Sequence, residues 1–186
     1  HFQLFERASS GEVRAREVLY WQPNFRDKIQ VTEAEALERI DAALKEGVRK
    51  RMIADVPLGA FLSGGVDSSL VVAMMSQLSS KPVKTFSIGF AEQDFSELEY
   101  SDAVAKRYQT EHQQIRLKPD VLEILPSLVW EYGEPFADSS AIPTYYVSKA
   151  AKEFVTVALT GDGGDELFGG YNIARASFHA MRYDAC

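Results

Sequence analysis

The stretch Phe61-Leu-Ser-Gly-Gly-Val-Asp-Ser-Ser-Leu70 is the part of the sequence that decides the fold. An apolar run over residues 56–62 leads into it and predicts a buried strand. Residues 66–78 are apolar almost all round, which is typical of a helix buried in a larger domain. Between the two, Ser63, Gly64 and Gly65 permit a tight turn. This order of strand, glycine turn and helix gathers free backbone N–H groups at the positive end of a helix, which favours phosphate binding.

The side chains of this turn fit the same kind of site. The hydroxyls of Ser63, Ser68 and Ser69 add donors, whereas Asp67 would repel phosphate unless a divalent cation lies between them. An ordinary turn capped by Asp and Ser is the alternative, and the run of fitting residues over 63–69 argues against it. The Walker pattern is absent, with no Lys in the turn. The stretch resembles the pyrophosphate-binding loop of the ATP pyrophosphatase superfamily, whose members split ATP between the α and β phosphates.

Composition excludes several classes of function. The apolar content of 46% and the charged content of 25% in 186 residues suit one globular α/β domain. No apolar run is long enough to span a bilayer and no signal-peptide pattern is present, so we expect no membrane partner and a cytoplasmic location. The net charge of -7 argues against nucleic-acid binding. The single cysteine, Cys186, excludes an internal disulfide and is compatible with a reducing cytosol.

The rest of the sequence alternates between predicted helices and strands. Beyond the central stretch, we expect strands over 84–90, 112–117 and 154–159, and helices over 32–54, 96–108, 120–132 and 143–153. Capping boxes, Thr32 with Glu35 and Ser96 with Glu99, begin two of these helices, and Pro126 is expected to break another into two pieces. The basic run 49–51 is interpreted as a solvated helix end rather than a phosphate clamp.

Alternating strands and helices predict a parallel sheet with right-handed crossovers and helices on both faces, a Rossmann-like three-layer α/β fold. Ligands bind beyond the carboxyl ends of the strands in such sheets. The loops after Leu62, Ile88 and Leu159 all lie at such ends. We therefore expect these three loops to converge on one pocket.

A second glycine-rich stretch, Leu159-Thr-Gly-Asp-Gly-Gly-Asp-Glu-Leu-Phe-Gly-Gly-Tyr171, follows the last predicted strand. Its glycines allow the backbone to approach a ligand, and Asp162, Asp165 and Glu166 supply three carboxylates. Two carboxylates and phosphate oxygens are what Mg²⁺ typically takes from a nucleotide site, so we expect Asp67 and Asp165 to hold Mg²⁺. EF-hand spacing is absent. A solvated acidic turn is the alternative, but it does not explain the glycines.

Together, the stretches 62–69 and 159–171 closely resemble the C-terminal synthetase domain of glutamine-dependent asparagine synthetases. Residues 133–138 and 56–59 also match, and the similarity covers about residues 18–180. The resemblance implies an adenine nucleotide alpha-hydrolase-like fold. It also implies that ATP adenylates the side-chain carboxylate of aspartate with release of pyrophosphate, and that ammonia then gives asparagine and AMP.

The resemblance also implies roles for individual residues. Leu62 and Ile88 would frame the adenosine, while Thr160 and Gly161 would contact the adenylate. Pyrophosphate would be held by Ser63, Gly64, Gly65, Asp67, Ser68 and Ser69. Asp162 stands where the family often has Glu, and it would act as the general base toward the attacking ammonia. Glu134 and Asp138 are candidates near the aspartate amino group, and their alternative is to cap the next helix.

The resemblance further implies a domain organisation. Residues 1–31, with their apolar run 18–21, would be the last strand and linker of a preceding glutaminase domain, or else a disordered leader. Residues 32–186 would be a partial ATP-pyrophosphatase domain truncated at its C-terminus. The nucleophilic N-terminal Cys of the glutaminase is missing because residue 1 is His, so ammonia would come from the glutaminase domain of the intact chain.

Other functions stay open at this point. We expect the fragment alone to bind nucleotide weakly and to turn over poorly, and a homodimer is left open. A related amidotransferase or β-lactam-synthetase-like ligase acting on another carboxylate is one alternative. A noncatalytic nucleotide-binding module is the other.

Overall fold

The computed structural model describes residues 1–24, 26–90, 98–117, 121–134 and 136–183. The chain divides into two compact units, His1–Arg39 and Ile40–Cys186. Among the described residues, no helix is both long and apolar enough to cross a bilayer. The predicted capping box at Ser96 and the polar loop before it lie outside the described residues.

The first unit contains an antiparallel hairpin of β1 (Phe2–Arg7) and β2 (Val13–Val18). The expectation of a strand over residues 18–21 was wrong, because β2 ends at Val18. The register pairs Val18 with Phe2, the first residue of β1, so residues 19–21 have no described strand opposite them. Extended backbone without such a partner gains no ladder hydrogen bonds.

Helix α1 (Glu33–Arg51) begins at the predicted capping box, which is confirmed. The Thr32 N–H donates to the Glu35 carboxylate at 2.8 Å, and the Glu35 N–H donates to the Thr32 hydroxyl at 3.3 Å. Two backbone donors that the helix itself leaves unpaired are satisfied in this way. On the same helix, Val48 is buried and joins the core of the second unit.

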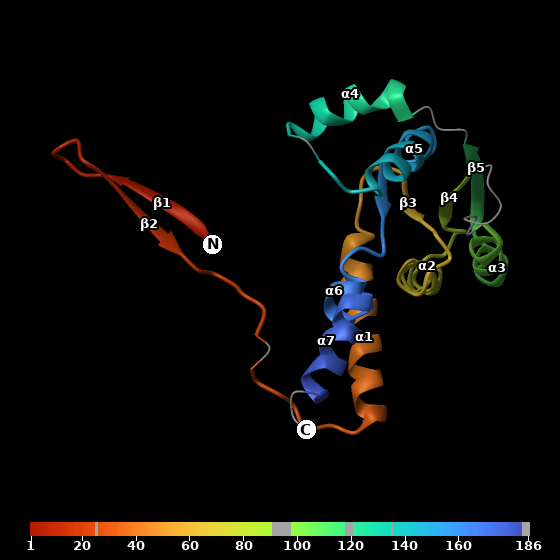
Figure 1. The fold of residues 1–186 in the computed structure, drawn as a ribbon, viewed down its shortest axis with the longest axis horizontal. Coiled ribbons are helices and arrows are strands. Elements are labelled where there is room, and N and C mark those ends of the chain that lie inside the picture. The colour runs from red at the N-terminus through yellow and green to blue at the C-terminus, as the bar shows by residue number, and fades with distance from the viewer. Residues whose placement is uncertain (25, 91–97, 118–120, 135, 184–186) are drawn as a thin grey trace. The chain divides into compact units, whose positions relative to one another are not determined.

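The second unit is built on a four-stranded sheet in the order β5-β4-β3-β6, with all neighbours parallel (Figure 1). The strands are β3 (Leu58–Phe61), β4 (Lys84–Phe90), β5 (Glu111–Leu117) and β6 (Val157–Leu159). The predicted parallel sheet is confirmed, but β3 and β6 are shorter than expected. Pro57 has no N–H to give to a ladder, and the amides of Phe154 and Val155 donate back to the Ala151 carbonyl.

Helices cover both faces of this sheet, as the sequence predicts (Figure 1). Ala60 of β3 packs in one core cluster with Val72 of α2 (Val66–Leu78) and Ala105 of α3 (Leu98–Tyr108). The next residue, Phe61, packs on the opposite face with Val147 of α5 (Ala141–Ala151). Neighbouring residues of a strand point to opposite faces, so this alternation produces three layers.

The strand order places one topological switch point beside β3. The chain runs from β3 to β4 and then to β5 in one direction, and it returns on the other side of β3 as β6. The carboxyl ends of β3 and β6 are therefore neighbours, since Ala60 pairs with Leu159. Open α/β sheets bind ligands at such a point.

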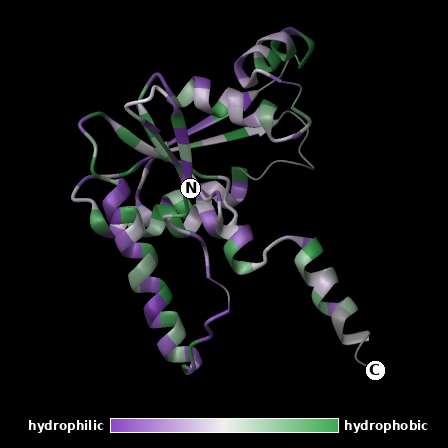
Figure 2. Cartoon of the chain, turned by 90° about the vertical axis from the view of Figure 1, so that its left-hand side faces the viewer, coloured by the Kyte–Doolittle hydropathy of each residue, from purple (hydrophilic) through white to green (hydrophobic). Residues whose placement is uncertain are grey.

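Three further helices complete the described part of this unit: α4 (Val121–Tyr132), α6 (Gly164–Phe168) and α7 (Asn172–Tyr183). The expected break at Pro126 was wrong, because α4 continues through it. Proline removes one hydrogen bond of the helix, and the rest of the ladder is enough to keep it continuous here. Near the C-terminus in Figure 2, α7 mixes hydrophobic with hydrophilic residues, and its Ile173 is 72% exposed.

The buried character predicted for residues 66–78 holds for the middle of α2 but not for its beginning. Val72, Met74 and Met75 are buried, whereas Val66 is 83% exposed. Val66 begins the helix at the carboxyl edge of the sheet, where the loops meet and no described core residue covers it. The apolar pattern therefore overstates how much of this helix is enclosed.

Candidate functional site

The loop after β3 is closed by its own hydrogen bonds. The Ser63 hydroxyl accepts from the Gly65 N–H at 3.2 Å and shares a 2.9 Å hydrogen bond with the Ser68 hydroxyl. Ser68 also donates to the Gly65 carbonyl at 3.3 Å. Gly64 has φ +90°, and a Cβ there would lie 2.6 Å from the Tyr100 Cβ on α3. The turn thus requires glycine for its conformation and for its contact with α3.

The loop after β6 brings the second set of carboxylates. The Thr160 hydroxyl donates to the Asp162 carboxylate at 2.9 Å, and the Asp162 N–H donates back to that hydroxyl at 3.3 Å. These two bonds fix the Asp162 side chain relative to its own backbone. The short helix α6 follows directly and carries Asp165 and Glu166 in its first turn.

The two loops touch each other at glycine positions. A Cβ on Gly161 would lie 2.7 Å from the Ser68 nitrogen, and a Cβ on Gly164 would lie 2.4 Å from Cγ of Asp67. No ordinary side chain fits at such distances. The carboxylate of Asp67 therefore lies directly against the residue that precedes Asp165.

These loops open into one cleft of about 960 Å³ at the carboxyl edge of the sheet. The predicted site residues on its wall are Ser63, Gly65, Asp67, Ser68, Asp138, Thr160, Gly161, Asp162 and Asp165. The structure thus brings together residues that lie roughly a hundred positions apart in the sequence. We refer to this feature below as the cleft.

Five predicted site residues do not line the cleft: Leu62, Gly64, Ser69, Ile88 and Glu134. Leu62 is buried in the core, its N–H donates to the Phe86 carbonyl, and its own carbonyl accepts from the Ser87 hydroxyl. Ile88 packs on the α5 face of the sheet. The Ser69 hydroxyl is enclosed and has no partner among the described residues, and Glu134 is exposed.

A further wall of the cleft comes from the start of α5. Asp138, Ser140 and Thr144 line it there. The Ser140 N–H donates to the Asp138 carboxylate at 2.8 Å, and this backbone bond lowers the pKa of Asp138. Ser140 and Thr144 were not among the site residues predicted from the sequence. Their spacing of four residues around Pro143 on a predicted helix start was the signal that could have found them.

Glu166 and Tyr171 also line the cleft, and they are bonded to each other. The Tyr171 hydroxyl donates to the Glu166 carboxylate at 2.6 Å. This bond is the main cause of a lowered pKa at Glu166, and it raises the pKa of Tyr171 to about 12. At neutral pH the pair is therefore a phenol donating to a carboxylate.

The carboxylates of the cleft suit a metal ion that is shared with a bound ligand. Among the described residues, no group of three or more His, Cys, Asp or Glu side chains is arranged to bind a metal. Asp67 and Asp165 nevertheless face the same cleft from adjoining loops. Mg²⁺ usually takes one or two carboxylates and completes its shell with phosphate oxygens and water. The two residues fit that use.

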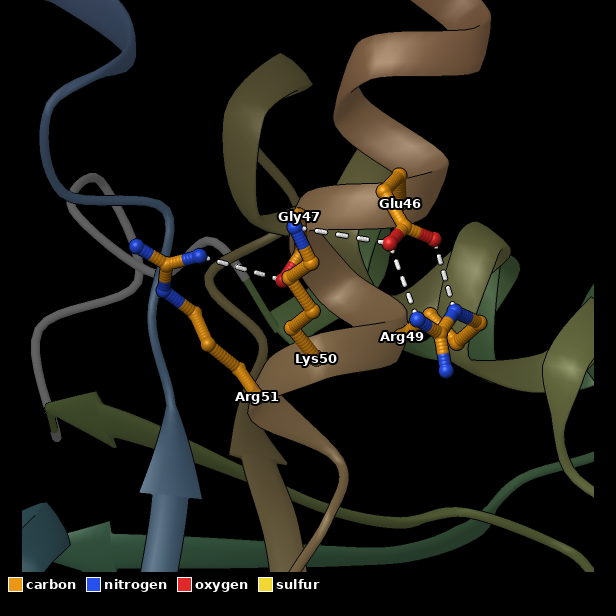
Figure 3. Close-up of polar contacts among 5 residues, drawn as sticks. All are labelled: Glu46, Gly47, Arg49, Lys50 and Arg51. Atoms are coloured by element: carbon orange, nitrogen blue, oxygen red, sulfur yellow. Dashed lines mark hydrogen bonds and ion pairs between the residues drawn. The ribbon is translucent and has the colours of Figure 1, made fainter.

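The basic run at the end of α1 is already engaged with its own helix (Figure 3). The Arg49 guanidinium donates to the Glu46 carboxylate at 2.6 and 2.8 Å, and it lowers the pKa of Glu46 to about 2. The Lys50 amine lies 3.5 Å from the same carboxylate, and Arg51 donates to the Gly47 carbonyl at 3.1 Å. None of the three basic residues lines the cleft. This agrees with the interpretation of the run as a solvated helix end.

Comparison with known sequences decides the family. Residues 39–185 match the family described as asparagine synthase. The chain belongs to the asparagine synthase family. It is 42% identical over 157 residues to asparagine synthetase [glutamine-hydrolyzing] 1 of Bacillus subtilis, a match that covers 84% of this chain and 24% of that protein. It is 43% identical over 159 residues to the putative asparagine synthetase [glutamine-hydrolyzing] 2 of Methanocaldococcus jannaschii, covering 84% and 30%.

Within this family, the chain spans about a quarter to a third of the length of these relatives. Comparison with solved structures supports the fold. The glutamine-dependent NAD⁺ synthetase from Acinetobacter baumannii in complex with ADP aligns with a TM-score of 0.52 at 20% identity, over 78% of this chain and 29% of that one. The predicted adenine nucleotide alpha-hydrolase-like fold of this asparagine synthase family member is confirmed.

Proposed function

We propose that the chain is the adenylating part of an asparagine synthase, an ATP-dependent ligase that forms a C–N bond. The main observation behind this proposal is the cleft at the switch point of the sheet, which the serine-rich loop after β3 and the acidic loop after β6 line together. The names of the relatives, asparagine synthetases [glutamine-hydrolyzing], support aspartate as the substrate.

In the first half-reaction, an oxygen of the aspartate side-chain carboxylate attacks the α-phosphorus of ATP. A new O–P bond forms, the bond between the α-phosphorus and the bridging oxygen breaks, and pyrophosphate leaves with that oxygen. Backbone N–H groups and hydroxyls of the loop 63–69 would bind the departing pyrophosphate. The Ser63 and Ser68 hydroxyls, which now bond to each other, would exchange that bond for phosphate oxygens.

Asp67 and Asp165 would hold Mg²⁺ beside the phosphates. When bound, the ion supplies positive charge that offsets the phosphate charge and favours the leaving of pyrophosphate. The contact of Gly164 with the Asp67 carboxylate supports this role, because it places Asp67 against the residue next to Asp165 in the sequence. The contributions of Leu62 and Ile88 to the adenosine site, and of Gly64 and Ser69 to the pyrophosphate site, stay predictions.

In the second half-reaction, ammonia attacks the carbonyl carbon of the aspartyl-adenylate, and the C–O bond to AMP breaks. One proton of the attacking nitrogen must leave, and Asp162 would accept it. Thr160 holds the Asp162 carboxylate in the cleft and supports this assignment. Asp shortens the reach by one methylene compared with Glu, and the loop glycines let the backbone come closer.

The α-ammonium group of aspartate requires an acceptor. Asp138 is favoured over Glu134, because Asp138 lines the cleft and its pKa is lowered by the Ser140 N–H, so it carries negative charge at neutral pH. Glu134 is exposed and lies outside the cleft wall. Substitution of Asp138 should therefore weaken aspartate binding more than substitution of Glu134.

The intact protein would obtain ammonia from a glutaminase domain. The description of the relatives as glutamine-hydrolysing supports this partner, and residues 1–31 would be the end of that domain and its linker. Residues 32–186 would then be part of the ATP-pyrophosphatase domain. A cytoplasmic location and a homodimer stay proposals of the same kind.

The test is ATP–pyrophosphate exchange with a panel of carboxylic acids, using the intact protein that carries this chain. We expect exchange with aspartate, and we expect Asp67→Asn and Asp165→Asn to reduce it at least a hundredfold, about 2.7 kcal/mol. Asp55→Asn, at an exposed carboxylate outside the cleft, should retain it. Exchange with another acid but not with aspartate would redirect the assignment to a related ligase. Nucleotide binding without any exchange would indicate a noncatalytic module.

A further inference from the structure

Tyr171 lies in the cleft beyond the end of α6, and its hydroxyl reaches back to Glu166 at 2.6 Å. Glu166 itself lies in the first turn of α6. The hydrogen bond therefore joins Tyr171, beyond the end of α6, to the first turn of that helix.

The chain between Glu166 and Tyr171 folds back onto Asp165. Gly169 has φ +68°, and the N–H groups of Gly169 and Gly170 both turn to the Asp165 carbonyl, at 3.1 Å for Gly170. Such a left-handed cap is a common way to end a helix. A Cβ on Gly170 would lie only 1.8 Å from the Asp165 Oδ1. The backbone at Gly170 therefore forms one side of the space that the Asp165 carboxylate can occupy.

We propose that Tyr171 is a positioning residue that sets the orientation of the Asp165 carboxylate. The hydrogen bond from Tyr171 to Glu166 holds residues 169–171 over α6. These residues then limit the rotamers that the Asp165 side chain can adopt. A ligand carboxylate that is already oriented loses less freedom when it binds its ion. The inference rests on the proposed function, in which Asp165 holds Mg²⁺.

Tyr171→Phe removes the hydroxyl and retains the ring. Without this hydrogen bond, we expect the dissociation constant for Mn²⁺, measured with ATP present, to rise about 3- to 10-fold. This range corresponds to the loss of one hydrogen bond to a charged acceptor that is partly exposed. Free Mn²⁺ is followed by electron paramagnetic resonance in the intact protein. Tyr108→Phe on α3, outside the cleft wall, should leave the constant unchanged.

Two comparisons separate positioning from general support of the fold. Glu166→Gln and Glu166→Ala both remove one negative charge from the cleft, but only Glu166→Gln keeps an oxygen that can accept from Tyr171, so Glu166→Gln should bind Mn²⁺ more tightly than Glu166→Ala. In an Asp165→Asn background, followed at higher Mn²⁺ concentration, Tyr171→Phe should change the constant less than twofold. A residue that acts only on overall stability would lower Tm and have the same effect in both backgrounds.

The outcomes distinguish this inference from the function it rests on. If the wild type binds Mn²⁺ no better with ATP than without it, the proposed function fails and the inference fails with it. If the wild type binds Mn²⁺ with ATP and Tyr171→Phe binds it equally well, only the inference is overturned. Additive effects of Tyr171→Phe and Asp165→Asn would also overturn it and would leave the proposed function intact.

Discussion

Replacing Gly164 by alanine tests whether the two loops hold Asp67 in the site. The added Cβ would lie 2.4 Å from Cγ of Asp67 and 2.5 and 2.8 Å from its two carboxylate oxygens. Non-bonded heavy atoms rest at about 3.5 Å or more, so the carboxylate must move by about 1 Å. The required movement is at the functional group itself.

The effect on stability should be small, because two contributions oppose each other. Moving Asp67 away from its rotamer costs about 0.5–1.5 kcal/mol. Alanine in place of glycine stabilises by about 0.4–1 kcal/mol at a compatible backbone position, because it reduces the freedom of the unfolded chain. We therefore expect the free energy of unfolding of Gly164→Ala, measured with urea, to differ from the wild type by about 1 kcal/mol or less.

The effect on chemistry should be much larger. A displacement of about 1 Å in a positioned group can lower a rate about a hundredfold, which corresponds to about 2.7 kcal/mol in the activation free energy. We expect aspartate-dependent ATP–pyrophosphate exchange by the intact protein to fall by about this factor. The variant should thus lose exchange while remaining folded.

A matched control is available on α1. A Cβ on Gly47 would meet only the Arg51 Nη1, at an ordinary 3.7 Å. Gly47, whose carbonyl accepts from Arg51 (Figure 3), does not line the cleft. Gly47→Ala should stabilise the chain by up to about 1 kcal/mol and leave exchange unchanged. Exchange at the wild-type rate in folded Gly164→Ala would refute the placement of Asp67 against α6 as a requirement for activity.

Three further predictions concern pH, metal and the second half-reaction. Burial lowers the pKa of His112, so the unfolded chain binds a proton there more readily than the folded chain does. The free energy of unfolding should therefore decrease as pH falls from about 6.5 through the lowered folded-state pKa. Urea unfolding between pH 5 and 8 should show this decrease in the wild type and not in His112→Gln. Adding EDTA should weaken ATP binding at least tenfold by calorimetry and leave the Tm of the nucleotide-free protein unchanged, because the cleft supplies only two carboxylates to the ion. Asp162→Asn should retain aspartate-dependent exchange but lose most asparagine formation in a direct amino-acid assay.

The parts of the fold that could be predicted are those with local signals. The turn from β3 into α2 and the bounds of β4 follow from glycine placement and apolar runs, and the structure confirms them. The β1–β2 hairpin was missed because its strands carry charged residues such as Glu6 and Arg14, which do not stand out as a strand pattern. Pro126 was given too much weight, because the effect of a single lost hydrogen bond depends on the rest of the helix.

The candidate site divides in the same way. The meeting of Asp67 with the loop around Asp165 could be predicted, because both loops leave the same edge of a parallel sheet. The place of Leu62 could have been predicted as well, since strand alternation puts it on the face of Ala60, under α2. The bond between Tyr171 and Glu166 could not, because it depends on how the turn after α6 closes.

The charge on the cleft wall limits how ATP can enter. Among its described lining residues the cleft has no Lys, Arg or His, and its ionisable groups include five carboxylates, on Asp67, Asp138, Asp162, Asp165 and Glu166. Two like charges about 5 Å apart repel by roughly 3 kcal/mol at the effective dielectric of a protein surface. Free ATP and the carboxylate of aspartate would both meet this repulsion, and helix-end N–H groups offset only part of it. We therefore expect ATP to bind this cleft as its Mg²⁺ complex and not as the free anion.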